Sequence, residues 1–156
     1  ILNNIGFSED NMSIDKASYY ATLSDVHDNI LGFKEGYQTE IGERGVTLSG
    51  GQKQRVSIAR ALAKDAPILI LDDSVSAVDT KTEEAIIKNL YDIRKNKTTI
   101  IIAHRISTVK KMDKIILLDE GKLLDIGTHT ELLTRCELYQ DMVKKQTLEA
   151  MVEGEK

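Results

Sequence analysis

A serine and two glycines stand where the sequence predicts the start of a helix. The segment is Leu48-Ser49-Gly50-Gly51-Gln52, and an apolar-periodic run follows it. A helix N-terminus presents free amide groups and a partial positive charge, so it attracts anions. Glycines let an anion approach that backbone closely, and the serine adds a hydroxyl donor. Taken alone, the segment is equally typical of a glycine-containing capping box.

Two adjacent carboxylates end an apolar run further along the chain. Asp72 and Asp73 directly follow Ile68–Leu71. In open α/β sheets, ligands gather at the carboxyl ends of the strands. Asp72 could hold Mg²⁺ there through water, since this hard cation prefers oxygen ligands, and Asp73 could face an attacking water. The common alternative is that two acids simply end a strand in solvent.

A histidine follows another apolar run. His104 comes directly after the predicted strand Thr98–Ala103. If this strand is a parallel neighbour of the run before Asp72, His104 lies at the same end of the sheet. A neutral imidazole can donate to a phosphate oxygen while the backbone holds its other nitrogen. The other two histidines, His27 and His129, are interpreted as surface or capping residues.

Short apolar runs alternate with amphipathic segments from Pro67 onward. The predicted strands are Ile68–Leu71, Thr98–Ala103, Lys114–Asp119 and, more weakly, Lys122–Ile126. The segment Thr82–Lys95 lies between the first two and has its apolar residues on one helical face. Strands without polar alternation, separated by a helix, predict a parallel sheet that is buried on both faces.

Capping signals place the helices. Ser13 is predicted to cap one helix, and Asp25–Leu31 to form another. Three capping boxes begin at Ser49, Thr80 and Thr128. The tail Glu131–Met151 has apolar residues at helical spacing, namely Leu132, Leu133, Cys136, Tyr139 and Val143. The polar, helix-like first part and the strand-containing later part therefore differ in character.

Composition narrows the functional classes. With 156 residues and a net charge of -4, the chain fits one compact domain, and it has no long basic run that would favour nucleic-acid binding. A single cysteine, Cys136, excludes an internal disulfide and favours an intracellular chain. The apolar runs are far shorter than the roughly 20 residues that cross a bilayer. The first residue is Ile1 rather than methionine, and no signal peptide follows it, so we expect an excerpt of a longer chain.

Four motifs together resemble the ATP-binding domain of ABC transporters. The first segment resembles the ABC signature motif, Leu71-Asp72-Asp73 the end of the Walker B strand, Ser76-Ala77-Val78-Asp79 the D-loop, and Ile102-Ala103-His104-Arg105 the switch-histidine loop. They follow the family's order and spacing along the chain. The stretch Gly36–Gly45 is similar to the one before the signature in ABC exporters, where it touches the helices that lead to the transmembrane part.

The resemblance implies a fold, a site and partners. The fold would be α/β, a partial P-loop NTPase core with a mostly parallel sheet plus an α-helical subdomain, divided into residues 1–64 and 65–156. The resemblance assigns Asp73 and His104 to catalysis, Asp72 to the metal, and Ser49, Gly50, Gly51, Gln52 and Asp79 to nucleotide binding. ATP and Mg²⁺ would bind in the complete dimer of domains. The partners would be a second ATP-binding domain and a transmembrane domain fused upstream, at the cytoplasmic face of the cell membrane, with no nucleic acid.

Two features depart from the family pattern. No G-x-x-x-x-G-K-[ST] loop is present, and the adenine-stacking aromatic residue and the glutamine loop would precede Ile1, so the chain should hold no ATP unaided. Asp73 stands where most active members have glutamate. Because aspartate is one methylene shorter, its carboxylate lies about 1.5 Å further from the target. A misplacement of about 1 Å can cost on the order of a hundredfold in rate. This favours the degenerate half of a heterodimeric exporter, whose signature serves the partner's site; slow hydrolysis at Asp73 is the alternative.

Three interpretations follow. An ABC exporter is preferred. A soluble ABC-type ATPase of the chromosome-maintenance or translation type is second, and the Gly36–Gly45 stretch and the lack of coiled-coil heptads or a basic face argue against it. The third is an inactive fragment. The transported substrate is not predictable, because the membrane domain would recognise it.

Overall fold

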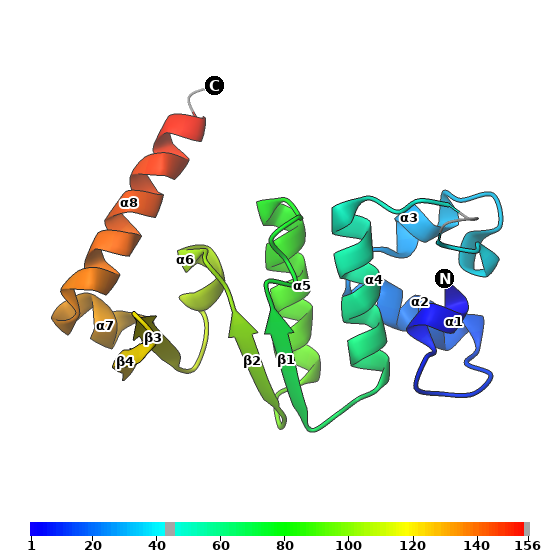
Figure 1. Cartoon of the computed structure of the whole chain (residues 1–156), viewed down its shortest axis with the longest axis horizontal. Coiled ribbons are helices and arrows are strands. Elements are labelled where there is room, and N and C mark those ends of the chain that lie inside the picture. Colours follow the sequence, from blue (N-terminus) through cyan, green and yellow to red (C-terminus); the bar gives the residue numbers. More distant parts are fainter. Residues whose placement is uncertain (43–45, 155–156) are drawn as a thin grey trace. The chain divides into compact units, whose positions relative to one another are not determined.

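The computed structural model describes residues 1–42 and 46–154. The chain divides into two compact units, Ile1–Ile102 and Ala103–Lys156 (Figure 1). Residues 43–45 of the exporter-like stretch lie outside the described residues. Within the described part, none of the helices combines the length and the apolar character that a membrane span requires.

The first unit begins with helices. They are α1 (Leu2–Ile5), α2 (Ile14–Leu23), α3 (His27–Leu31), the 3₁₀ helix η1 (Gly36–Gln38) and α4 (Gly50–Ala63). The predicted cap at Ser13 is confirmed, since its side chain accepts from the Lys16 N–H at 3.2 Å. The prediction that the next helix starts at Asp25 is wrong. Asp25 has φ 57, a left-handed conformation that a right-handed helix cannot include.

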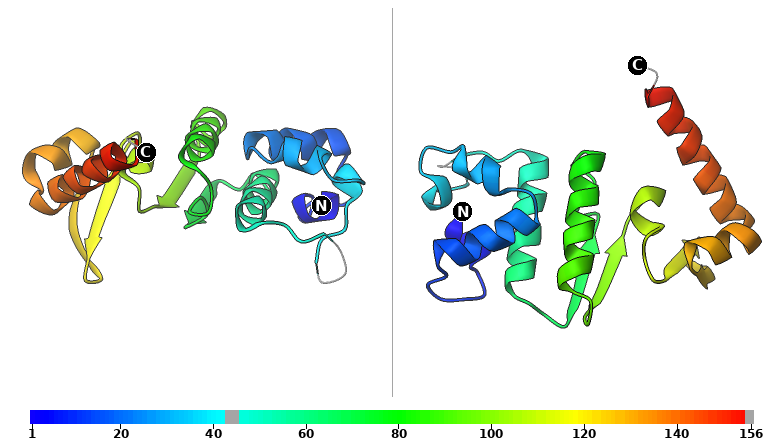
Figure 2. Two further views of the ribbon diagram at one scale, coloured as in Figure 1. Left: turned by 90° about the horizontal axis from the view of Figure 1, so that it is seen from above. Right: turned by 180° about the vertical axis from the view of Figure 1, so that it is seen from behind.

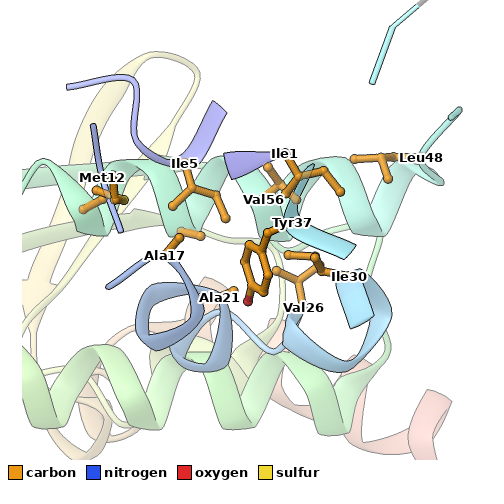
Figure 3. Close-up of a cluster of buried hydrophobic side chains, with 12 residues drawn as sticks. Ile1, Ile5, Met12, Ala17, Ala21, Val26, Ile30, Tyr37, Leu48 and Val56 are labelled. Carbon is orange, nitrogen blue, oxygen red and sulfur yellow. The ribbon is translucent and has the colours of Figure 1, made fainter. Parts of the chain in front are cut away.

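These helices share one hydrophobic core. Its fully or nearly buried members are Ile1, Ile5, Met12, Ala17, Ala21, Val26, Ile30, Tyr37, Leu48, Val56, Ala59 and Ala63 (Figure 3). The last three lie on α4, at the three- and four-residue spacing that puts side chains on one helical face. The core therefore fixes the helix that the signature-like motif begins.

A parallel pair of strands follows α4. Strand β1 (Ile68–Asp72) pairs with β2 (Thr98–Ile102), and the connection between them contains α5 (Thr80–Ile93). The register places Asp72 opposite Ile102. In Figure 1 α5 lies behind β1, and in the reverse view of Figure 2 it lies in front, so it covers one face of the sheet. The predicted parallel pairing is confirmed.

Only one face of this sheet is buried, so the prediction of burial on both faces is wrong. On β1, Leu69 and Leu71 point inward, whereas Ile68 and Ile70 are 58% and 60% exposed. Ile100 and Ile102 are likewise exposed on β2. The strands lack polar alternation because isoleucine occupies the exposed positions as well. Contiguous exposed apolar surface of this kind commonly marks an interaction face.

We expect this exposed face to make the isolated chain self-associate. Replacing Ile70 and Ile100 together with threonine keeps β-branched side chains while making the face polar. Light scattering should then give a mass near the 17.4 kDa of one chain, whereas the unchanged chain should give a larger mass. Phe7→Ser is the control, because Phe7 is 82% exposed but lies outside the sheet. A monomeric unchanged chain would contradict the prediction.

The second unit contains an antiparallel hairpin and three helices. Its elements are α6 (Ile106–Val109), β3 (Ile115–Asp119), β4 (Lys122–Gly127), α7 (His129–Arg135) and α8 (Glu137–Gly154). Glu120 and Gly121 connect β3 to β4 with φ values of 46 and 74. Positive φ at both central residues is what a two-residue hairpin turn requires. The described strands thus form one parallel pair and one antiparallel pair.

The tail Glu131–Met151, whose apolar residues have helical spacing, is helical but is divided between two helices. Cys136 separates α7 from α8 in an extended conformation, with φ -109 and ψ 104. The core of this unit is made by Ile106, Ile115, Leu117, Leu132, Cys136 and Tyr139. The predicted capping box at Thr128 is confirmed at the start of α7.

Candidate functional site

The start of α4 has the geometry that its sequence predicted. The Ser49 hydroxyl accepts from the Gln52 N–H at 3.2 Å, and the Gln52 side chain accepts from the Ser49 N–H at 3.0 Å. The capping box is therefore confirmed. It fixes the helix start whose amide groups and dipole attract anions, so the structural and functional interpretations of this segment are compatible.

Gly51 lies against the D-loop segment within the same unit. A Cβ atom at Gly51 would come within 2.7 Å of the Ala77 carbonyl oxygen, a distance that backbone atoms cannot accommodate without shifting. A Cβ atom at Gly50 would approach the Ala77 Cβ only to 3.8 Å. Sequence reasoning assigned both glycines to anion approach. The structure adds a packing reason that applies to Gly51 alone.

Gln54 ties α4 to the loop after β1, and sequence reasoning missed it. Its Nε2 donates to the Asp73 carbonyl oxygen and to the Ser76 hydroxyl, both at 3.1 Å. Its Oε1 accepts from the Ala77 N–H at 3.0 Å. One side chain thus holds three points of the loop after β1, which begins at Asp73 and contains the segment that resembles the D-loop. We call this contact the Gln54 joint.

The two carboxylates lie at the exposed carboxyl end of β1. Asp72 is the last residue of the strand, and Asp73 adopts φ 49. Such a conformation persists in a non-glycine residue where neighbouring contacts hold it. Here the Asp73 carbonyl accepts from Ser76 Oγ at 3.0 Å as well as from Gln54, and its N–H donates to the Ile102 carbonyl at 3.4 Å.

The residues fit Mg²⁺ as a partly hydrated ion. Among the described residues, no three or more histidine, cysteine, aspartate or glutamate side chains come together as a metal-binding group. Mg²⁺ usually takes one or two carboxylates and completes its shell with water and phosphate oxygens. The exposed Asp72 carboxylate meets that requirement as a donor.

Asp79 begins α5, which corrects the prediction that Thr80 caps this helix. The Asp79 Oδ1 atom accepts from the N–H groups of Lys81 at 3.0 Å and Thr82 at 3.1 Å. Hydrogen bonds from Thr82, its backbone N–H first, hold the pKa of Asp79 below the usual value. Asp79 precedes Thr80 by one residue, and its carboxylate takes the N-cap position. Asp79 therefore stands exposed at a helix start, close in sequence to the Gln54 joint.

A turn in the helical part contacts both α4 and α5. Arg55 donates to the Asp25 carbonyl oxygen and lies 3.4 Å from its carboxylate. The Thr82 hydroxyl donates to the same carboxylate at 3.2 Å. Asp25 thus links α2 and α3 to the helices that begin at the signature and at the D-loop.

The histidines have distinct environments. His104 lies two residues after the end of β2. The last residue of β2, Ile102, is paired with Asp72. His104 itself belongs to the second unit, so its meeting with Asp72 remains a prediction. His27 and His129 are half-buried and hydrogen-bonded to tyrosine hydroxyls, at 2.7 Å from Tyr37 and 2.9 Å from Tyr139. The N-cap positions of α3 and α7 are taken by Val26 and Thr128. The interpretation of the two histidines as surface or capping residues is therefore corrected to a structural role.

Comparisons with known proteins agree with these motifs. A family model described as ABC transporter matches residues 7–76. The alpha-hemolysin translocation ATP-binding protein HlyB of Escherichia coli is 46% identical over 148 residues, which are 94% of this chain and 21% of HlyB. The ATP-dependent lipid A-core flippase of Shewanella frigidimarina is 42% identical over 147 residues, which are 94% of this chain and 24% of the flippase.

A solved structure has the same fold. The structure of a bacterial Atm1-family ABC exporter with ATP bound matches with a TM-score of 0.86 and 43% sequence identity. The match covers 93% of this chain and 26% of the exporter chain. The chain therefore belongs to the ATP-binding domains of ABC transporters. Within that class it is homologous to exporters, and it spans about a fifth to a quarter of the length of these relatives.

Proposed function

We propose that this chain is the ATP-binding and ATPase region of an ABC exporter. ATP binding and hydrolysis at an interface between two such domains would drive export across the membrane. The observation that supports this best is the Gln54 joint, together with the close approach of Gly51 to Ala77. These contacts support the proposal because they join α4, whose start is the proposed anion-binding site, to the segment that follows the proposed Mg²⁺ ligand Asp72 and contains the proposed catalytic residue Asp73.

Each residue of the site has a proposed task. Ser49, Gly50, Gly51 and Gln52 contact the phosphates of a nucleotide held by the partner domain, with Asp79 beside them at the start of α5. Asp72 holds Mg²⁺, Asp73 orients the attacking water, and His104 donates to a phosphate oxygen. Mg²⁺, when bound, neutralises charge that develops on the phosphate oxygens. The donor set fits these tasks, since it combines a helix N-terminus with carboxylates at a strand end.

The short side chain of Asp73 suggests unequal sites. Hydrolysis would be weak at this chain's own site and stronger at the site that its signature completes on the partner. A heterodimer with one competent and one degenerate site follows from this proposal. This proposal rests on the shorter reach of the Asp73 carboxylate, because aspartate has one methylene fewer than the glutamate of most active relatives.

The site would belong to a domain made of two parts. Residues 1–64 would form the α-helical subdomain and residues 65–156 the later part of the ATPase core; helices give way to strands between α4 and β1. The partners would be a second ATP-binding domain and a transmembrane domain fused upstream. The domain would therefore work at the cytoplasmic face of the cell membrane, with ATP and Mg²⁺ as cofactors.

We expect no saturable ATP binding by the isolated chain. It has no phosphate-binding loop or loop lysine, and one helix start offers few donors. Isothermal titration with ATP and Mg²⁺ should show no binding, whereas the full-length protein in membranes should bind and hydrolyse ATP. A micromolar dissociation constant for the isolated chain would contradict the first expectation. Activity that remains in the soluble fraction after the membranes are pelleted would contradict the exporter proposal.

A further inference from the structure

Gln146 on α8 contacts the loop that carries His104. Its Nε2 donates to the His104 carbonyl oxygen at 2.7 Å, and its Oε1 accepts from the Ile106 N–H at 2.7 Å. One planar amide therefore binds the backbone on both sides of Arg105. We propose that Gln146 is a positioning residue that holds this loop so that the imidazole of His104 can meet the nucleotide. This inference rests on the proposed function of His104.

The contact supplies a hydrogen-bond acceptor at the start of α6. The helix begins at Ile106 and is four residues long, and its N-cap residue Arg105 makes no side-chain capping hydrogen bond. The first N–H groups of a helix need acceptors from outside the helix. Gln146 supplies one from 40 residues further along the chain. The Ile106 side chain is buried, so a lost partner for its N–H would be costly to replace.

The position of Gln146 is itself fixed by the core of the second unit. Tyr139, Val143 and Gln146 follow one another at the spacing that places side chains on one face of a helix. Tyr139 is almost fully buried, and its hydroxyl is hydrogen-bonded to His129 at 2.9 Å. Val143 packs partly buried against the same core. The buried stripe of α8 thus ends in an amide that is aimed at the histidine loop.

This arrangement gives α8 a function beyond packing. The amide of Gln146 restrains the backbone on both sides of Arg105. Without it, the loop would sample more conformations, and His104 would contact the nucleotide in fewer molecules. We expect the loss to fall on kcat rather than on the KM for ATP, because the helix start at Ser49 is unchanged.

Amide hydrogen exchange in the isolated chain tests the contact directly. In Gln146→Ala the Ile106 amide should exchange roughly tenfold faster, because it loses its acceptor. In Gln146→Glu it should stay protected, since the carboxylate still accepts, while the ¹³C shift of the His104 carbonyl should change because that donor is lost. An unfolded α8 would expose Ile106 equally in both variants, so the difference between them distinguishes positioning from general destabilisation.

Gln140→Ala is the matched control. Gln140 is also on α8, but its Nε2 donates to the Leu133 carbonyl at 2.8 Å, away from the histidine loop. The control should leave the exchange of Ile106 unchanged. Unchanged exchange in Gln146→Ala, or equal acceleration in Gln140→Ala, would overturn the proposal.

Activity of the full-length exporter tests the consequence, in an Asp73→Glu background that favours hydrolysis at this chain's own site. Gln146→Ala should lower kcat about tenfold and change KM less than about twofold, the split expected when a transition-state contact is lost. Full activity in His104→Ala would refute the role of His104, and with it the purpose assigned to Gln146. Loss of activity in His104→Ala together with full activity in Gln146→Ala would overturn only the proposal for Gln146.

Discussion

Replacing Ser49 with arginine in the full-length exporter is expected to lower phosphate release by about a hundredfold or more. The bulky cation would break the capping box, whose two hydrogen bonds join Ser49 to Gln52, and would fill the space before the first turn of α4. Donors aimed at developing phosphate charge are worth about 10²–10³ in rate each. The loss should fall on the partner's site, where the proposed function has the signature act in trans.

Changes at Asp73 should act in the opposite way. Asp73→Glu restores the reach of the carboxylate and should raise hydrolysis at this chain's own site by about tenfold or more. Asp73→Asn should leave total turnover nearly unchanged, because a degenerate site, as proposed here, would contribute little to it. Steady-state phosphate release is the measurement for all three variants. If Asp73→Asn abolishes turnover while Ser49→Arg preserves it, the assignment of competent and degenerate sites is reversed.

Gly51→Ala should destabilise the first unit much more than Gly50→Ala. The added Cβ at Gly51 would lie 2.7 Å from the Ala77 carbonyl oxygen, so α4 and the D-loop segment must separate. Overpacking of this kind costs about 1–3 kcal/mol. At Gly50 the nearest atom is 3.8 Å away, so an added methyl group meets no obstacle there, and alanine has the higher helix propensity. The second variant is therefore expected to be as stable as the parent or more so.

Urea denaturation followed by circular dichroism measures this difference in the free energy of unfolding. The two variants add the same methyl group to adjacent positions of one helix, so helix propensity alone predicts similar effects. Equal stabilities would mean that the α4 contact with Ala77 is loose, and would remove the packing role assigned to Gly51. A selective loss in Gly51→Ala, accompanied by lower turnover in the full-length exporter, would support a stable joint between the signature helix and the D-loop.

Local signals in the sequence predicted much of this fold. The capping boxes at Ser49 and Thr128 were readable because all their donors and acceptors lie within four residues. The parallel pairing of β1 with β2 was readable because two apolar runs flank an amphipathic helix. The box at Thr80 failed because Asp79, one residue earlier, offers the stronger acceptor.

Other features depend on contacts that the local pattern does not reveal. The apolar spacing continues across Cys136 without glycine or proline. The sequence therefore contains no local signal for the break between α7 and α8. Burial on both sheet faces was expected because isoleucine fills the exposed positions of β1 as densely as leucine fills the buried ones. Exposure depends on what packs against a face, and the strand sequence does not show this.

The two positioning glutamines were missed for a different reason. Gln54 bonds to residues 19, 22 and 23 positions away, and Gln146 to residues 40 and 42 positions away. Glutamine is also among the most ordinary residues on an exposed helix surface, so its type carries little information. A polar residue at the spacing of a buried helical stripe, as at Gln146 after Tyr139 and Val143, is the signal that could have identified it.

The turn at Asp25 restricts which amino acids this position can accept. Its φ of 57 disfavours residues other than glycine, asparagine and aspartate, while its side-chain oxygen accepts from the Thr82 hydroxyl. Asparagine satisfies both requirements, glycine only the first, and alanine neither. The contact from Arg55 to the carbonyl oxygen survives any of these exchanges, because it uses the backbone. Very few substitutions at this position are therefore expected to be neutral, although the residue is exposed and lies outside the motifs.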